Sequence, residues 1–259
     1  MDSEKENIKR IKRGLSWVEI KNALQQEGCF ICTIIQNAVI KYFDNILYEY
    51  ALDASVHKKI ISAMGLCNTH TQLLLEVEKD KGDGLSAGSL FETTLHKEIR
   101  LIDEIGKLHP PNDKNFTIDN QSKKVLKGYK GKIKRTLIPT GQCIGCEQQN
   151  HTESFYTHET LRIWGDEEFQ ELYESEKIML CRSHFIHIIV EAENKEVIDY
   201  FISSQKNKLD SLDFLLFEFI RKHDYRFQKE MTNKDRESWT KVLEYLGSKK
   251  GVKRKDYNN

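Results

Sequence analysis

The chain has 259 residues, of which 39% are hydrophobic and 31% are charged, and its 40 acidic side chains balance its 40 basic ones. A net charge of zero creates no overall field that would draw the protein onto nucleic acid or an anionic membrane, so we expect neither as a partner. Three prolines and 14 glycines are few for this length, which favours long helices over many short strands.

The N-terminal segment, Met1 to Arg13, is charged throughout and lacks the apolar stretch of a signal peptide. No run in the sequence approaches the roughly 20 apolar residues that are needed to span a bilayer. We therefore expect a cytoplasmic protein with no membrane segment. In that reducing compartment, paired cysteines more often hold metal than form structural disulfides.

Helical periodicity dominates the first part of the chain. Ser16 and Glu19 have the spacing of a capping box, which predicts a helix start at Trp17. Asp53 is expected to cap a shorter helix, and the glycines at 82 and 84 to break the chain. In chain order, the pattern predicts helices over residues 17–26, 30–52, 54–64, 71–78 and 85–107.

Residues 108–138 differ in character from the rest. His109-Pro110-Pro111 and a run of polar residues precede a basic segment from Lys123 to Arg135. We predict a solvated linker, and contact with phosphate or with an acidic partner stays open as an alternative. Tyr129 is the one aromatic residue in the basic segment, so stacking on bases is not expected.

The second part of the chain repeats the plan of the first. A helix is predicted through Tyr156 and Trp164, with Asp166 at the following turn and Asn194 as a later cap. Further helices are predicted over residues 167–175, up to about residue 192, and over residues 195–221. We therefore expect a first repeat over residues 1–107, the linker over 108–138, a second repeat over 139–247, and a basic, disordered tail over 248–259.

All six cysteines belong to one motif that is written twice. In each copy, Cys-x-x-Cys is followed after 34 residues by Cys-x-x-His, and the second copy starts 114 positions after the first. Three thiolates and one imidazole are typical of a tetrahedral zinc site with four protein ligands, which is the structural type. We predict two zinc ions, one held by Cys29, Cys32, Cys67 and His70, the other by Cys143, Cys146, Cys181 and His184.

The 34-residue gap predicts how each motif closes. A helix of about 20 residues climbs roughly 30 Å, and a shorter helix with an extended piece would return Cys67 and His70 to Cys29 and Cys32. The expected fold is therefore all-α: a duplicated helical-hairpin bundle, with each repeat tied by a Cys₃His metal site and with a long C-terminal helix. An iron–sulfur cluster is chemically allowed, but we expect zinc.

Several further segments agree with a known family. They are Gly28–Cys32, Ile46–Glu49, Gly65–His70, Gly82–Gly84, Cys143–Cys146, Leu180–His184, Phe219–Phe227 and Ser238-Trp239. With them the chain, from about residue 16 to 247, resembles an uncharacterised prokaryotic family, a domain of unknown function with paired Cys-x-x-Cys…Cys-x-x-His helical repeats. The resemblance implies no activity. The chain departs from it by carrying Phe30-Ile31 and Ile144-Gly145 where members often have proline.

A polar block follows the long helix at residues 221–226. One interpretation is a helix end, where cations are favoured by the helix dipole and Asp224 turns the chain. The other is a site for an anion or a partner, made by Arg221, His223 and Arg226. Both interpretations stay open on the sequence.

The sequence favours a non-enzymatic scaffold that binds a protein partner, because every cysteine is used by the motif and no phosphate loop or Gly-x-Ser-x-Gly nucleophile is present. The alternative is a thiol-based redox protein, or a metal-responsive one, that uses its Cys-x-x-Cys pairs. An enzyme with a polar cavity near the C-terminal block is a third hypothesis, for which the sequence shows no defined catalytic constellation.

Overall fold

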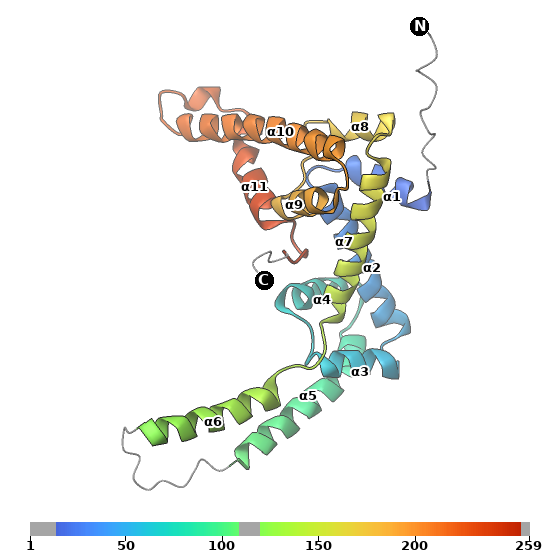
Figure 1. Ribbon diagram of the computed structural model, residues 1–259, viewed down its shortest axis with the longest axis vertical. Coiled ribbons are helices and arrows are strands. Elements are labelled where there is room, and N and C mark those ends of the chain that lie inside the picture. Colours follow the sequence, from blue (N-terminus) through green and yellow to red (C-terminus); the bar gives the residue numbers. More distant parts are fainter. Residues whose placement is uncertain (1–13, 109–119, 255–259) are drawn as a thin grey trace. The chain divides into compact units, whose positions relative to one another are not determined.

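The computed structural model describes residues 14–108 and 120–254 (Figure 1). Within these residues it is all-α, as expected, and the only β-type contact is an isolated bridge between Gly28 and Ile178. The helices are α1 Leu15–Leu24, α2 Phe30–Glu49, α3 Ala54–Ser62, α4 Asn68–Lys81, α5 Leu85–Gly106, α6 Asn120–Leu137, α7 Ile144–Ile163, α8 Glu167–Tyr173, α9 Arg182–Glu191, α10 Lys195–Arg221 and α11 Asn233–Gly247, with a 3₁₀ turn at Gln228–Glu230. None of the described helices is both long and apolar enough to cross a membrane.

The chain forms two compact units that do not coincide with the two repeats. In the described chain, unit 1 comprises residues 14–39 and 149–254, and unit 2 comprises residues 40–148. The boundaries fall inside α2, after Val39, and inside α7, after Gln148. Each unit therefore contains parts of both sequence repeats.

Unit 1 is built around four aromatic rings that are almost fully buried. Phe30 of α2 packs edge-on against Phe169 and Tyr173 of α8, and Tyr173 packs edge-on against Phe201 of α10. Such pairs bury large apolar areas with a defined geometry. Because Phe30 directly follows Cys29, this core also holds the start of the first Cys-x-x-Cys motif in place.

Unit 2 contains α3, α4, α5 and α6. Leu73 and Leu74 of α4 are buried, as are Ile60 of α3 and Leu90 of α5. Helix α3 packs against α5, and α5 against α6 (Figure 1). The result is a small apolar core next to the segment that carries Cys67.

Two predicted helix caps, Asp53 and Asn194, are confirmed, the expected capping box at Ser16 is wrong, and Asp166, which was predicted at a turn, is a further cap. The side chains of Asp53, Asp166 and Asn194 accept hydrogen bonds from the first-turn amides of α3, α8 and α10. Ser16, by contrast, lies inside α1, whose N-cap is Gly14. Its hydroxyl donates to the carboxylate of Glu159 on α7, so a contact distant in the sequence replaces the expected capping box.

Part of the expected linker is helical. Helix α6 covers residues 120–137, where lysines are good helix formers and the hydroxyl of Tyr129 donates to the carbonyl of Leu108 at 3.2 Å. The sequence at His109–Pro111 lies outside the described residues.

The segment after α11 is also ordered where a disordered tail was expected. Val252 is buried, and the side chain of Gln149 binds both the amide and the carbonyl of Lys253, at 2.9 and 2.6 Å. These contacts satisfy backbone groups that the residues of a free tail would expose to water. Residues 255–259 lie outside the described part.

Candidate metal centres

The eight predicted ligands gather into two clusters, but the pairing along the chain is crosswise. Cluster 1 consists of Cys29, Cys32, Cys181 and His184, and cluster 2 consists of Cys67, His70, Cys143 and Cys146. In each cluster the four ligand atoms all lie within 4.8 Å of one another. The prediction of two Cys₃His groups is confirmed, whereas the expectation that each Cys-x-x-Cys pairs with the next Cys-x-x-His along the chain is wrong.

The returning helices are shorter than the outgoing ones. Helix α2 has 20 residues and extends about 30 Å, whereas α3 has nine residues and extends about 14 Å. Helices α7 and α8 have 20 and seven residues. A return therefore also depends on the path of the segment after each short helix, and the structure places Cys67 with Cys143 and Cys146 and not with Cys29.

Cluster 1 has the dimensions of a tetrahedral metal site. The Nδ1 atom of His184 lies 3.3 Å from the sulfur of each of the three cysteines, and the sulfurs of Cys32 and Cys181 are 3.6 Å apart. In a tetrahedral zinc site, bond lengths of about 2.3 Å to sulfur and 2.0 Å to nitrogen place two sulfurs about 3.8 Å apart and a sulfur and a nitrogen about 3.5 Å apart. The observed edges are close to these values.

The backbone around Gly28 joins the two halves of cluster 1. The amide of Gly28 donates to the carbonyl of Lys177 at 2.9 Å, and the amide of Met179 donates to the carbonyl of Gly28 at 3.2 Å. Gly28 adopts a φ of 98°, a conformation that glycine enters without steric cost. The bridge sets Cys29 beside Cys181, which is the N-cap of α9, and His184 follows in the first turn of that helix.

A buried carboxylate lies behind the histidine of cluster 1. Glu153 Oε1 is 3.5 Å from Nε2 of His184 and 3.1 Å from Nδ1 of His187, and the Glu153 side chain is 1% exposed. A carboxylate that accepts from the second ring nitrogen fixes the tautomer and the orientation of a metal-binding histidine. No motif in the sequence indicates Glu153. It follows Cys146 by two helical turns, and the equivalent residue of the first repeat is Val39.

The C-terminal segment covers another edge of cluster 1. The hydroxyl of Ser248 lies 3.4 Å from the sulfur of Cys181, and Lys249 Nζ donates to the hydroxyl of Thr33 at 3.2 Å. Gln36 donates to the carbonyl of Lys250 at 2.9 Å. We call residues 248–253 the C-terminal strap, because they are fastened to α2 and, through Gln149, to α7.

Cluster 2 has comparable dimensions. Nδ1 of His70 lies 3.2 Å from the sulfur of Cys67, 3.6 Å from that of Cys143 and 3.4 Å from that of Cys146. The sulfurs of Cys67 and Cys146 are 3.6 Å apart. Four ligands are therefore arranged here as they are in cluster 1.

The surroundings of cluster 2 are more open and less polar. Cys67 and Cys143 are half-buried, whereas all four ligands of cluster 1 are buried. Nε2 of His70 is buried and has no hydrogen-bond partner among the described residues. Gly145 is required beside His70, because a β-carbon at this position would lie 2.5 Å from Cγ of the imidazole.

Without a cation, the sulfurs of each cluster cannot all be thiolates. In cluster 2, hydrogen bonds with Cys146 and His70 lower the pKa of Cys143 to about 3, while the bond with Cys143 and burial raise the pKa of Cys146 far above its usual range. In cluster 1, the pKa of Cys181 is lowered by its hydrogen bonds with Cys29 and Cys32, and that of Cys32 is raised by its bonds with Cys181 and Cys29. A bound divalent cation would remove this conflict by stabilising all three thiolates.

Comparison with known proteins identifies the family of the chain. A family model described as "Family of unknown function (DUF6062)" matches residues 1–84 and 78–253. The chain belongs to the DUF6062 family. It is 20% identical over 226 residues to the "Uncharacterized 23.9 kDa protein in xynA 3'region" of Caldicellulosiruptor sp. (strain Rt8B.4). The aligned region covers 86% of this chain and 96% of that protein. No solved structure matches the chain.

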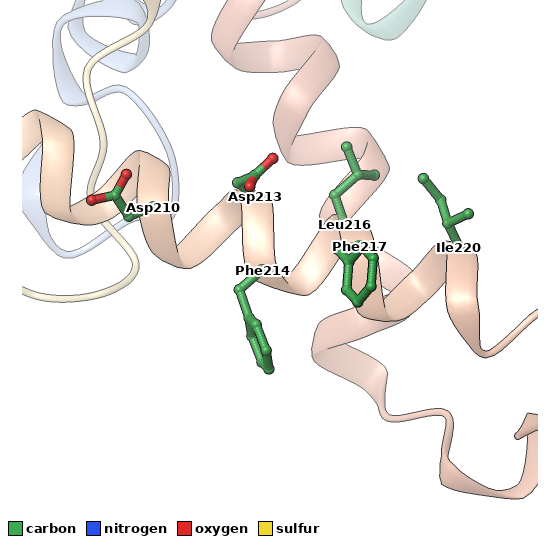
Figure 2. Close-up of a pocket in the computed structure, with 6 residues that line it drawn as sticks. All are labelled: Asp210, Asp213, Phe214, Leu216, Phe217 and Ile220. Atoms are coloured by element: carbon green, nitrogen blue, oxygen red, sulfur yellow. The ribbon is translucent and has the colours of Figure 1, made fainter.

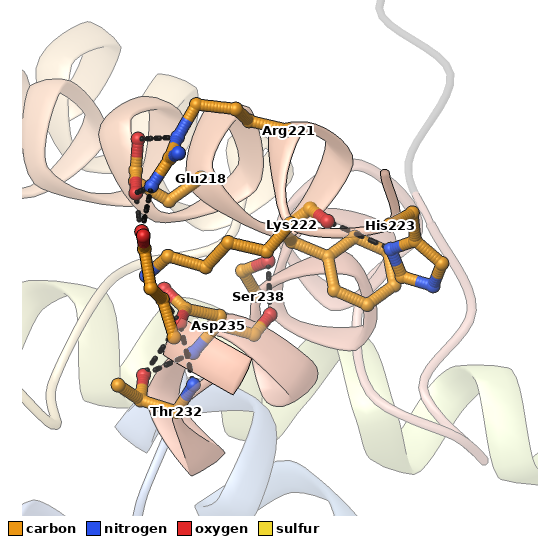
Figure 3. A network of polar contacts seen from close by, with 9 residues as sticks. Glu218, Arg221, Lys222, His223, Thr232, Asp235 and Ser238 are labelled. Carbon is orange, nitrogen blue, oxygen red and sulfur yellow. Dashed lines mark hydrogen bonds and ion pairs between the residues drawn. The ribbon is translucent and has the colours of Figure 1, made fainter. Parts of the chain in front are cut away.

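In this DUF6062 member, the polar block after α10 is engaged in internal contacts. Arg221 binds the carboxylates of Glu218 and Glu230, each at 2.7 Å, and Arg226 binds Asp224 at 2.7 Å. His223 Nδ1 lies 2.7 Å from the carbonyl of Phe219 (Figure 3). These contacts support a helix end in which each cationic side chain already has a partner.

Helix α10 carries a shallow, open depression lined by apolar and acidic side chains. It is lined by Asp210, Asp213, Phe214, Leu216, Phe217 and Ile220 (Figure 2). Phe214, Phe217 and Ile220 are each more than 60% exposed, and they follow one another at helical spacing. We call these three side chains the α10 ridge.

Proposed function

We propose that both clusters hold structural Zn²⁺ and that this DUF6062 member is a non-enzymatic, cytoplasmic scaffold that binds a protein partner. The observation that carries the proposal is that each cluster offers four protein ligands at the spacing of a tetrahedron. A catalytic zinc site has three protein ligands and keeps a position for water, which these ligand sets do not leave. Zinc also has no redox chemistry, which suits a scaffold.

The positions of the ligands in the chain support a structural role. Cys29 and His184 are 155 positions apart, and Cys67 and Cys146 are 79 apart. Closing loops of this length costs conformational entropy, which metal binding offsets. Because the binding free energy of a structural zinc is also folding free energy, removal of the metal should loosen or unfold both units.

The test is elemental analysis of natively purified protein that has met no added metal and no nickel column. We expect about two zinc atoms per chain in a colourless sample, since each Cys₃His cluster holds one ion. A chelator should then remove both ions and lower the helical circular dichroism signal together with the melting temperature. Iron with visible absorbance, or an apo form with full helicity and an unchanged melting temperature, would contradict the proposal.

Partner binding is supported by the α10 ridge. Exposed aromatic and aliphatic side chains in a contiguous patch mark interaction surfaces more often than single exposed residues do. Asp210 and Asp213 beside the ridge favour a protein partner with apolar side chains flanked by basic ones. The double variant Phe214→Ser/Phe217→Ser should keep its zinc and its melting temperature and lose proteins that co-purify with the wild type. Retention of the same proteins would exclude the ridge as the binding surface.

A metal-responsive protein is the second candidate, favoured by the incomplete burial of Cys67 and Cys143. Low equivalents of hydrogen peroxide would oxidise two thiolates of cluster 2 to a disulfide, reduce the peroxide to water and release the zinc. Zinc release together with reversible loss of thiols would support this function. Retention of zinc under those conditions would count against it.

A further inference from the structure

We infer that the two metal centres are not equivalent: cluster 2 is an exchangeable zinc site, and cluster 1 is a permanent one. The inference rests on the proposed function, because it requires zinc in both clusters. The protein then holds two zinc ions when zinc is plentiful and one when zinc is scarce, and only cluster 2 gains or loses its ion.

The first reason is access to the ligands. A chelator or a zinc acceptor removes a structural ion by attacking it next to a displaced thiolate, so the exposure of the sulfurs sets how readily attack begins. In cluster 1, Cys32, Cys181 and His184 are at most 2% exposed and Cys29 is 8% exposed. In cluster 2, the sulfur-bearing residues Cys67 and Cys143 are both half-buried. Attack on cluster 2 needs no prior opening of the fold at these two residues.

The second reason is the set of contacts behind the ligands. In cluster 1, Glu153 lies behind the imidazole of His184, and the hydroxyl of Ser248 lies against the sulfur of Cys181. In cluster 2, Nε2 of His70 has no such partner among the described residues. Loss of outer contacts of this kind lowers metal affinity by about 10- to 100-fold in other metal sites. The difference in surroundings therefore favours retention of zinc in cluster 1.

The third reason is the C-terminal strap. It lies against cluster 1 through Ser248, and it is held down by Gln36 and by both polar groups of the Gln149 side chain. The strap therefore covers the side of cluster 1 at Cys181.

The test is zinc transfer from the native two-zinc protein to an excess of EDTA, followed over time with alkylation of the cysteines. We expect two phases of equal amplitude whose rates differ by about tenfold or more, in line with the effect of outer contacts. At the end of the fast phase, mass spectrometry should find alkylated Cys67, Cys143 and Cys146 and protected Cys29, Cys32 and Cys181. A single phase, or alkylation of the cluster 1 cysteines first, would overturn the inference.

A pair of variants tests the strap by itself. Gln36→Ala/Gln149→Ala removes the side chains that fasten the strap and should accelerate only the slow phase. Lys253→Ala is the matched control, because Gln149 binds the backbone of this residue and its side chain is exposed. An unchanged slow phase in the double variant would contradict the inference that the strap slows the loss of zinc from cluster 1.

The two levels of the proposal fail in different ways. Fewer than about two zinc ions in protein that has been saturated with Zn²⁺ and then desalted would contradict the structural zinc sites themselves, since each cluster offers one complete ligand set. Two ions that leave together, with all six cysteines alkylated in parallel, would leave the structural sites intact and refute the exchangeable one.

Discussion

Glu153 Oε1 lies 3.5 Å from Nε2 of His184, so a buried carboxylate stands behind the one imidazole of cluster 1. Glu153 comes from α7 and His184 from α9, and the same carboxylate also accepts from His187 at 3.1 Å. The contact orients the imidazole so that Nδ1 faces the three sulfurs. It also makes the imidazole a stronger ligand.

The first prediction concerns this carboxylate. Glu153→Gln keeps the size of the side chain and removes its charge, so the zinc affinity of cluster 1 should fall by about tenfold. Competition with a zinc-binding dye measures the two affinities. Glu191→Gln is the matched control, because Glu191 is more exposed and touches only the far side of His187, at 3.8 Å. Equal affinities of cluster 1 in the wild type and in Glu153→Gln would show that the carboxylate does not support the ligand.

The second prediction concerns Gly145. A β-carbon at this position would lie 2.5 Å from Cγ of His70 and 2.8 Å from Cζ of Phe43, so Gly145→Ala must displace the ligand or the start of α7. We expect cluster 2 to lose its zinc and the protein to retain about one ion per chain, because cluster 1 contains none of these residues. Gly128→Ala on α6 is the control, since a β-carbon there meets nothing within 4 Å. Two ions per chain in Gly145→Ala would contradict the prediction.

The ligand residues could be predicted from the sequence, but their partners could not. The Cys-x-x-Cys and Cys-x-x-His spacings are local and identify the donors by chemistry alone. Each Cys-x-x-Cys could share a cluster with the Cys-x-x-His of its own repeat or with that of the other repeat. The spacing of 34 residues within each repeat does not distinguish these two pairings. The path of the chain between the motifs decides the pairing, and no local pattern reports that path.

The surroundings of the clusters were hidden for a similar reason. Asp53 and Asn194 can be predicted as caps from the sequence because each acts on amides two or three residues away. Glu153 and Ser248 act on ligands that are 31 and 67 positions distant, and neither residue belongs to a motif. No local pattern reports such contacts. They became visible only when the crosswise pairing placed α7, α9 and the C-terminal strap around one site.

The third prediction concerns Lys208, whose ammonium group holds the chain before Cys181. Its Nζ donates to the carbonyl of Tyr173 and, at 2.8 Å, to that of Ile178. Lys208→Met keeps the apolar stem and leaves these carbonyls without their donor, which should cost about 1–3 kcal/mol. Thermal unfolding measures the loss. Lys206→Met is the control, because Lys206 makes only an exposed ion pair with Asp210 on the same helix and should change stability by less than about 1 kcal/mol. Equal melting temperatures of the two variants would contradict the assigned role.

The fourth prediction concerns pH and the ion pair that joins α10 to α11. Lys222 Nζ lies 2.8 Å from the carboxylate of Asp235, which also accepts from the amide of Thr232 at 2.7 Å and forms the capping box of α11 (Figure 3). The hydrogen bond from Lys222, followed by that from the amide of Thr232, lowers the pKa of Asp235 from 3.8 to about 2. Asp235→Asn should therefore be less stable than the wild type at pH 7 and should lose the pairing of α10 with α11 first.

The pH dependence follows from the direction of this shift. Because the folded-state pKa of Asp235 lies below its unfolded value, the stabilisation by the carboxylate is complete above about pH 4 and is lost as the pH falls toward about 2. Urea unfolding of the wild type and of Asp235→Asn, measured side by side from pH 7 down to pH 2, should show a difference in midpoint that is constant at first and then vanishes over this range. Both proteins lose metal on acidification, so the difference between them isolates Asp235. A difference that persists at pH 2 would mean that the amide disturbs the packing of α11, and not that the charge of Asp235 stabilises it.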